Sequence, residues 1–171
     1  MYRYEDEKQI EHALLFLSDK LKNSHNSKPV LLHSIRVMLL LYAARYNVII
    51  LIAALLHDIL EDINTVYVDI EIAFGIEIAS LVKLSTMDNN MLDYKQQYIK
   101  NFNDIKNNKY ALIIRCADLV DNASYIKLAP MDIANKVQEK HNYFYSFAAN
   151  ILKDEPVWQK FSSVIKNATG K

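Results

Sequence analysis

The chain has 171 residues, of which 51% are hydrophobic and 23% are charged, and its 20 basic and 20 acidic residues give a formal net charge of zero. This composition is typical of a globular protein and gives no indication of a nucleic-acid or membrane partner. The single cysteine and the two glycines exclude an internal disulfide framework, a cysteine-rich zinc site and a glycine-rich phosphate loop.

The beginning of the chain, MYRYEDEKQI, is charged and lacks the apolar core of a signal peptide. The longest apolar run, NVIILIAALL, is too short to cross a bilayer as a helix, which takes about 20 residues. We therefore expect a cytoplasmic protein.

Apolar residues recur at helical spacing along nearly the whole chain, and the scarcity of glycine and proline favours long helices. The runs VII and TVYVDIEI have strand propensity, but their apolar spacing also favours helix. The spacing predicts an all-α protein of about seven to nine helices in one domain over residues 1–171. In chain order the expected helices cover roughly residues 5–22, 29–46, 47–60, 68–74, 75–84, 91–103, 109–128, 132–152 and 156–167.

Polar side chains fall on the apolar faces of three expected helices. His57 and Asp58 share the inward face of the third helix with Glu61, while His33 and Asp118 lie on the inward faces of two others. Each has an ordinary alternative, because a core histidine is more often hydrogen-bonded than a ligand and an aspartate near a helix end is often a cap.

Taken together, two histidines and two aspartates on three inward faces predict a single cation site. Imidazole nitrogens and carboxylate oxygens suit Mn²⁺, Fe²⁺, Co²⁺ or Zn²⁺, and the cation would offset the cost of burying the carboxylates. Such an ion makes a bound water much more acidic and so supplies hydroxide near neutral pH.

This pattern resembles the HD-domain metal-dependent phosphohydrolases, whose signature is a histidine, an His-Asp pair and a distant aspartate. The segments KPVLLHSIRV, AALLHDILED, IEIAFGIEIASLV and RCADLVDN resemble the hydrolase domain of the RelA/SpoT alarmone enzymes and of their small stand-alone relatives, over roughly residues 12–125. The resemblance implies an all-helical domain that binds Mn²⁺ and removes the 3′-pyrophosphate from (p)ppGpp. An HD 5′-nucleotidase, another phosphoesterase and a non-catalytic nucleotide-sensing HD module are the alternatives.

The resemblance also implies roles for individual residues. The metal ligands would be His33, His57, Asp58 and Asp118. The catalytic acidic pair would be Glu61 and Asp62. Substrate contacts would come from Asn122, Arg36, Lys28, Lys83 and Ser85, although Arg36 could instead pair with a carboxylate and Lys83 and Ser85 could be an ordinary helix end. A nucleotide is the expected partner, and the C-terminal helices, over roughly residues 132–168, could form a homodimer.

The sequence departs from this branch at positions that bear on the substrate. The segment KLKNSHNSK, before His33, has no arginine where these enzymes usually carry one. In the later motif, usually Lys-Leu-Ala-Asp-Arg-Leu-x-Asn, Arg115 replaces the lysine and Leu119 replaces the arginine. These changes spare the expected metal ligands and affect the choice of substrate.

Overall fold

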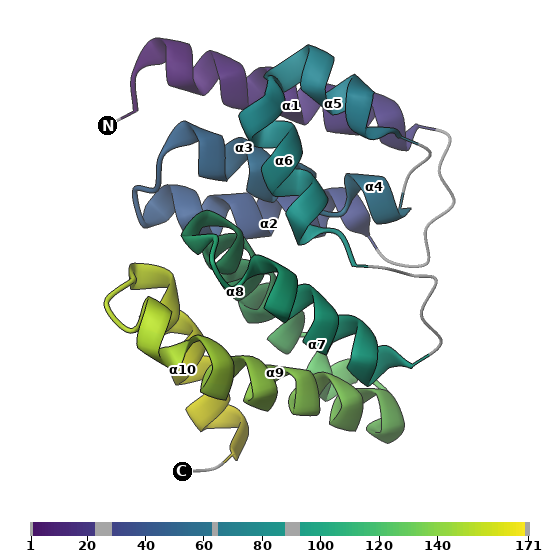
Figure 1. Ribbon diagram of the computed structural model, residues 1–171, viewed down its shortest axis with the longest axis vertical. Coiled ribbons are helices and arrows are strands. Elements are labelled where there is room, and N and C mark those ends of the chain that lie inside the picture. Colours follow the sequence, from purple (N-terminus) through teal and green to yellow (C-terminus); the bar gives the residue numbers. More distant parts are fainter. Residues whose placement is uncertain (1, 23–28, 63–64, 88–92, 170–171) are drawn as a thin grey trace. The chain divides into compact units, whose positions relative to one another are not determined.

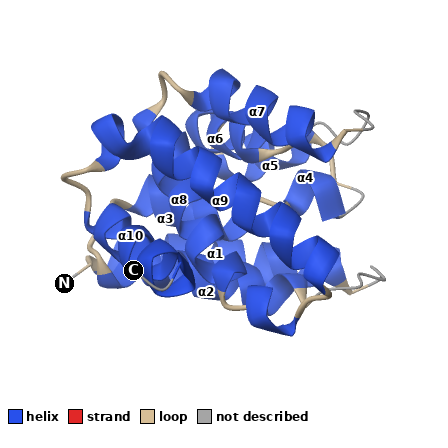
Figure 2. Ribbon diagram, turned by 90° about the horizontal axis from the view of Figure 1, so that it is seen from below, coloured by secondary structure: helices blue, strands red, loops and turns tan. Residues whose placement is uncertain are grey.

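The computed structural model describes residues 2–22, 29–62, 65–87 and 93–169. Within these ranges every regular element is a helix, as Figure 2 shows, and no strand occurs. Nine of the helices have eight residues or more, and α4 is a single turn. The predicted all-α class is confirmed.

The chain divides into two compact units, Met1–Met87 and Asp88–Lys171, which we call the N-terminal and the C-terminal unit. The N-terminal unit contains α1 (Tyr4–Leu21), α2 (Val30–Ala43), α3 (Val48–Leu56), α4 (Ile59–Asp62), α5 (Tyr67–Phe74) and α6 (Ile76–Ser85) (Figure 1). The C-terminal unit contains α7 (Tyr94–Ile105), α8 (Lys109–Ala123), the 3-10 helix η1 (Ile126–Leu128), α9 (Met131–Leu152) and α10 (Pro156–Thr169). That both units form one domain stays a prediction.

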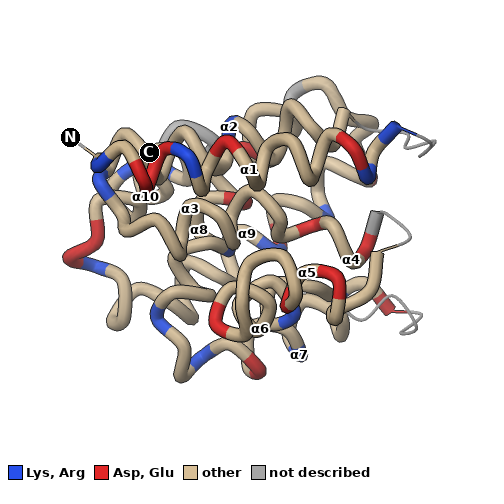
Figure 3. The backbone as a smooth tube through the Cα atoms, turned by 90° about the horizontal axis from the view of Figure 1, so that it is seen from above, with Lys and Arg blue, Asp and Glu red and all other residues tan. Residues whose placement is uncertain are grey.

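Helix α3 is the centre of the N-terminal unit. No charged residue occurs between Arg45 and Asp58, and α3 is drawn in tan in Figure 3, without the blue or red of charged residues. The helix packs against α1, α2 and α6, and its residues 50–56 are all buried, as expected of a helix that is apolar on every side. The Asn47 side chain caps its start by accepting a hydrogen bond from the Ile50 amide at 3.0 Å.

The expected helix 91–103 corresponds to α7, Tyr94–Ile105, and three further differences from the predicted boundaries concern how helices end. The expected helix 29–46 ends at Ala43, because Arg45 adopts a φ of 64° and the Tyr46 amide donates back to the Leu41 carbonyl, as in a Schellman motif. The expected helix 47–60 is divided into α3 and α4 by a turn. The expected helix 109–128 ends at Ala123 and is followed by η1.

Aromatic side chains dominate the core of the C-terminal unit. Phe102, Phe144 and Phe161 are fully buried and their rings pack edge to face, with Phe144 between the other two. His141 is also fully buried, and its Nδ1 and Nε2 atoms each lie 2.7 Å from a carbonyl oxygen, that of Val137 and that of Leu119 respectively. The contact with Leu119 ties α9 to the C-terminal half of α8.

Candidate metal centre

The orientation of the His57 ring identifies which of its nitrogens can bind a metal. Its Nδ1 atom lies 2.7 Å from the carbonyl oxygen of Ala54, one turn earlier in the chain. A carbonyl oxygen only accepts hydrogen bonds, so Nδ1 carries the proton. In the neutral imidazole the lone pair is then on Nε2, which is the arrangement found in metal-binding histidines.

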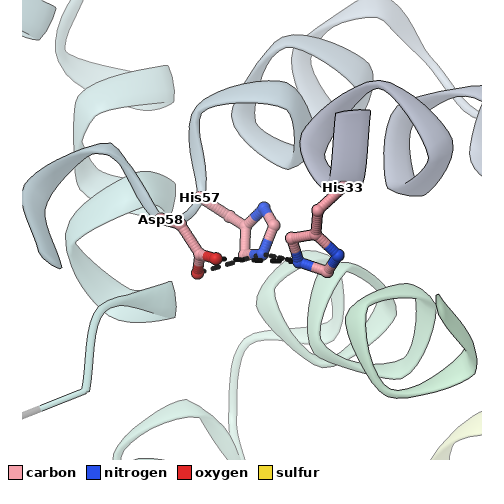
Figure 4. Close-up of side chains that lie close together, drawn as sticks. All are labelled: His33, His57 and Asp58. Carbon is pink, nitrogen blue, oxygen red and sulfur yellow. Dashed lines mark hydrogen bonds and ion pairs between the residues drawn. The ribbon is translucent and has the colours of Figure 1, made fainter. Parts of the chain in front are cut away.

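The Nε2 atom of His57 faces two further donor groups (Figure 4). It lies 3.3 Å from Nε2 of His33 and 3.1 Å from Oδ1 of Asp58, and Nε2 of His33 lies 3.6 Å from Oδ2 of Asp58. The potential ligand atoms of the three residues lie within 4.8 Å of one another, and all three residues are buried. Nitrogen and carboxylate donors this close together are stabilised by a shared cation, and this donor set fits a divalent transition metal.

His57 and Asp58, which are consecutive in the chain, lie where α3 ends. The helix α3 ends at Leu56, and His57 and Asp58 form a turn. Helix α4 begins directly after it, where the Glu61 amide donates to the Asp58 carbonyl at 3.0 Å. The break that divides the expected third helix therefore lies at the two expected ligands.

Asp118, the fourth expected ligand, lies on α8 in the C-terminal unit, so its place in the metal centre stays a prediction. Its side chain is buried, and each of its oxygens accepts a hydrogen bond from a residue of the same helix. Arg115 donates from Nη1 to Oδ2 at 2.7 Å, and Asn122 donates from Nδ2 to Oδ1 at 2.5 Å. Asn122, expected to contact the substrate, thus holds a carboxylate.

Glu61, the first of the expected catalytic pair, lies on α4 and is half-buried. Its Oε1 atom accepts a hydrogen bond of 2.5 Å from the backbone amide of Met87, the last residue of the N-terminal unit. Asp62 ends α4, and its side chain lies outside the part of the chain that the structure describes. Catalytic roles for both residues stay predictions.

The expected substrate contacts of the N-terminal unit occupy different environments. Arg36 is half-buried on α2, three residues after His33, and Lys83 is exposed with its Nζ 5.5 Å from the centre of the Tyr67 ring. Ser85 is buried, and its hydroxyl donates to the Leu81 carbonyl at 3.0 Å, as in an ordinary helix end. Lys28 lies outside the described residues. No role in substrate binding is established for these residues.

Sequence reasoning missed three hydrogen bonds to the expected site residues, two to Asp118 and one to Glu61. The spacing of Arg115, Asp118 and Asn122, at three and four residues, places them on one helix face and could have identified the group. The hydrogen bond from the Met87 amide could not be predicted from the sequence, because every residue except proline carries the same backbone donor.

Comparison with known families identifies the family to which the chain belongs. A family model described as HD domain matches residues 13–152, which is most of the chain. The chain belongs to the HD domain family. The HD-domain resemblance in the sequence is thereby confirmed.

The HD-domain chain is similar in sequence to curated alarmone hydrolases. It is 27% identical over 103 residues to the guanosine-3′,5′-bis(diphosphate) 3′-pyrophosphohydrolase MESH1 of Drosophila melanogaster, covering 60% of this chain and 56% of that protein. It is 28% identical over 164 residues to the bifunctional (p)ppGpp synthase/hydrolase SpoT of Escherichia coli, covering 88% of this chain and 23% of SpoT. The chain therefore matches about half of the first relative and about a quarter of the second.

Solved structures show the same fold. A metazoan orthologue of SpoT that hydrolyses ppGpp superimposes with a TM-score of 0.78 at 18% identity, and the match covers 98% of both chains. A Listeria monocytogenes protein superimposes with a TM-score of 0.67 at 21% identity, covering 81% of this chain and 99% of the other. Among the helices described, none is both long and apolar enough to span a membrane.

Proposed function

We propose that this protein is a metal-dependent phosphohydrolase that removes the 3′-pyrophosphate from (p)ppGpp or a closely related nucleotide. The observation that carries the proposal is the convergence of His33, His57 and Asp58, with the lone pair of His57 on the converging nitrogen. The substrate class is supported by the names of the relatives from Drosophila and Escherichia coli.

The cation would be held by His33, His57 and Asp58, with Asp118 as the fourth ligand. Mn²⁺ is the first candidate, and Fe²⁺, Co²⁺ and Zn²⁺ suit the same donors. When bound, such a cation supplies Lewis acidity, which makes a water more acidic and stabilises charge on a phosphoryl oxygen. The buried imidazole of His57 is held ready for this role because the Ala54 carbonyl fixes its tautomer.

Glu61 is proposed to accept the proton of the attacking water. Its carboxylate follows His57 by four residues, and the Met87 amide holds one of its oxygens. Proton acceptance by a positioned carboxylate contributes about 10²–10⁴-fold to a rate. Asp62, the next residue, is proposed to share this task.

The proposal is tested by incubating the purified protein with Mn²⁺ and a panel of nucleotides: ppGpp, pppGpp, NADPH, nucleoside triphosphates and nucleoside monophosphates. Hydrolysis of ppGpp consumes one water and yields GDP and pyrophosphate, so the expected result is equimolar release of these two products. Release of orthophosphate from monophosphates alone would identify a 5′-nucleotidase instead. Nucleotide binding without any hydrolysis would identify a sensing module and overturn the proposal.

A further inference from the structure

Three side chains on one face of α8 form a polar group inside the C-terminal unit. Arg115, Asp118 and Asn122 are separated by three and four residues, so they lie one above the other along the helix. Arg115 and Asp118 are each only 3% exposed, and Asn122 is half-buried. A guanidinium and a carboxylate are thus removed from water together.

The two donors engage different oxygens of the Asp118 carboxylate. Arg115 Nη1 donates to Oδ2 from the turn before, and Asn122 Nδ2 donates to Oδ1 from the turn after. An ionised carboxylate has about four acceptor sites, of which these bonds use two. Because the donors approach from opposite directions along the helix, they fix the rotation of the carboxylate about its Cβ–Cγ bond.

Helix stability alone gives little reason for this arrangement. On a helix surface, an acidic residue placed before a basic one interacts better with the helix dipole than the reverse order found here. A buried ion pair is also often no more stabilising than apolar side chains of similar volume. Stabilisation of α8 therefore does not by itself account for the burial of Arg115 beside Asp118.

We propose that Arg115 is a positioning residue: together with Asn122 it holds the Asp118 carboxylate in one orientation for the divalent cation. The inference rests on the proposed function, because it takes Asp118 as a metal ligand. Two effects of Arg115 oppose each other, since its positive charge repels a cation while its hydrogen bond orients the ligand. Loss of such an outer partner weakens metal binding about 10–100-fold in known metal sites, so we expect orientation to dominate.

The test measures the Mn²⁺ dissociation constant of the full-length protein by electron paramagnetic resonance, for the wild type, Arg115→Met and Arg115→Lys. The methionine side chain fills a similar volume without donors, and we expect it to weaken Mn²⁺ binding about 10–100-fold. Lysine restores one charged donor and should recover most of the lost affinity. Equal or tighter binding by Arg115→Met would overturn the inference.

Two control variants separate positioning from stability and charge. Leu112→Ala removes a fully buried side chain from the same helix, and Lys109→Met removes an α8 cation that pairs with Glu155 at 2.6 Å. Both should bind Mn²⁺ as the wild type does. An equal loss of affinity in Leu112→Ala would show that Arg115 acts only through folding of the unit.

The same experiment distinguishes this inference from the proposed function. If the wild type binds Mn²⁺ and Arg115→Met binds it equally well, only the role of Arg115 is wrong. If the wild type and Arg115→Met behave as expected but no nucleotide is hydrolysed, the inference stands and the proposed hydrolase activity fails. If the wild type binds neither Mn²⁺ nor Fe²⁺, Co²⁺ or Zn²⁺, both are overturned.

Discussion

The Nδ1 atom of His57 lies 2.7 Å from the Ala54 carbonyl oxygen, and this contact directs the other ring nitrogen, Nε2, toward His33 and Asp58. The donor and the acceptor come from the same turn at the end of α3. The tautomer of the histidine is therefore set by the local backbone structure at the end of α3.

Replacing Asp58 by asparagine should weaken Mn²⁺ binding by more than about 100-fold and abolish hydrolysis, because the proposed site loses one of its two anionic ligands while keeping its shape. Isothermal titration with Mn²⁺ measures the affinity, and circular dichroism checks that the helices remain. Asp69→Asn, which removes an acid paired with Lys20 at the surface of the same unit, is the matched control and should bind Mn²⁺ normally. Wild-type affinity in Asp58→Asn would exclude Asp58 as a ligand.

Replacing Glu61 by glutamine should leave Mn²⁺ affinity unchanged and lower kcat by about 10²–10⁴-fold. The glutamine carbonyl can still accept the hydrogen bond from the Met87 amide, so the side chain keeps its place but cannot take up a proton. Steady-state kinetics on the substrate found in the nucleotide panel provides the measurement. An unchanged kcat would show that another group accepts the proton.

Replacing Asn122 by alanine separates two roles of this residue. Since its amide donates to Asp118, we expect weaker Mn²⁺ binding, by about 10-fold, together with lower activity. A residue that contacts only the substrate would instead raise KM and leave metal affinity unchanged. Comparing the Mn²⁺ dissociation constant with KM for the same variant decides between the two.

The stability of the C-terminal unit should fall as the pH is lowered through the ordinary range of histidine titration, near pH 6.5. Burial is the largest effect on His141 and lowers its pKa, although the Leu119 and Val137 carbonyls act in the opposite direction. The folded state therefore binds fewer protons than the unfolded state below the ordinary histidine pKa, and acid favours unfolding.

Urea unfolding at pH 7.5 and pH 5.5, followed by the fluorescence of Trp158, measures this effect. The chain has one tryptophan, and it stacks on Tyr145 within the C-terminal unit, so its emission reports on that unit. In His141→Gln the free energy of unfolding should differ less between pH 7.5 and pH 5.5 than it does in the wild type. If the variant's free energy of unfolding changed with pH as much as that of the wild type, groups other than His141 would cause the pH dependence.

Gly75→Ala should destabilise the N-terminal unit by about 1–3 kcal/mol. Gly75 joins α5 to α6 with φ of 84° and ψ of 164°, a conformation that is essentially restricted to glycine. A Cβ atom at this position meets nothing within 4 Å, so the cost comes from the backbone alone. Thermal unfolding followed by circular dichroism measures it, and Ile72→Ala, at a highly exposed position, serves as a control expected within about 0.5 kcal/mol of the wild type.

Helical periodicity predicted the fold class and the inward positions of His33, His57 and Asp58, because these depend on spacing along one element. It failed at the end of α2, where Arg45 takes a left-handed conformation in which glycine is usual. It also did not reveal the hydrogen bond from the Asn122 amide to Asp118, and the expected contact of Asn122 with the substrate stays a prediction. Contacts between side chains one turn apart depend on rotamers, which apolar spacing does not reveal.

One partner of Glu61 is the backbone amide of Met87. Nineteen of the twenty standard residues at position 87 would supply the same donor, and only proline would remove it. Sequence variation at this position would therefore leave the contact intact, and a comparison of homologous sequences would not reveal it. Met87→Pro is the substitution that would remove this hydrogen bond, because proline has no backbone N–H.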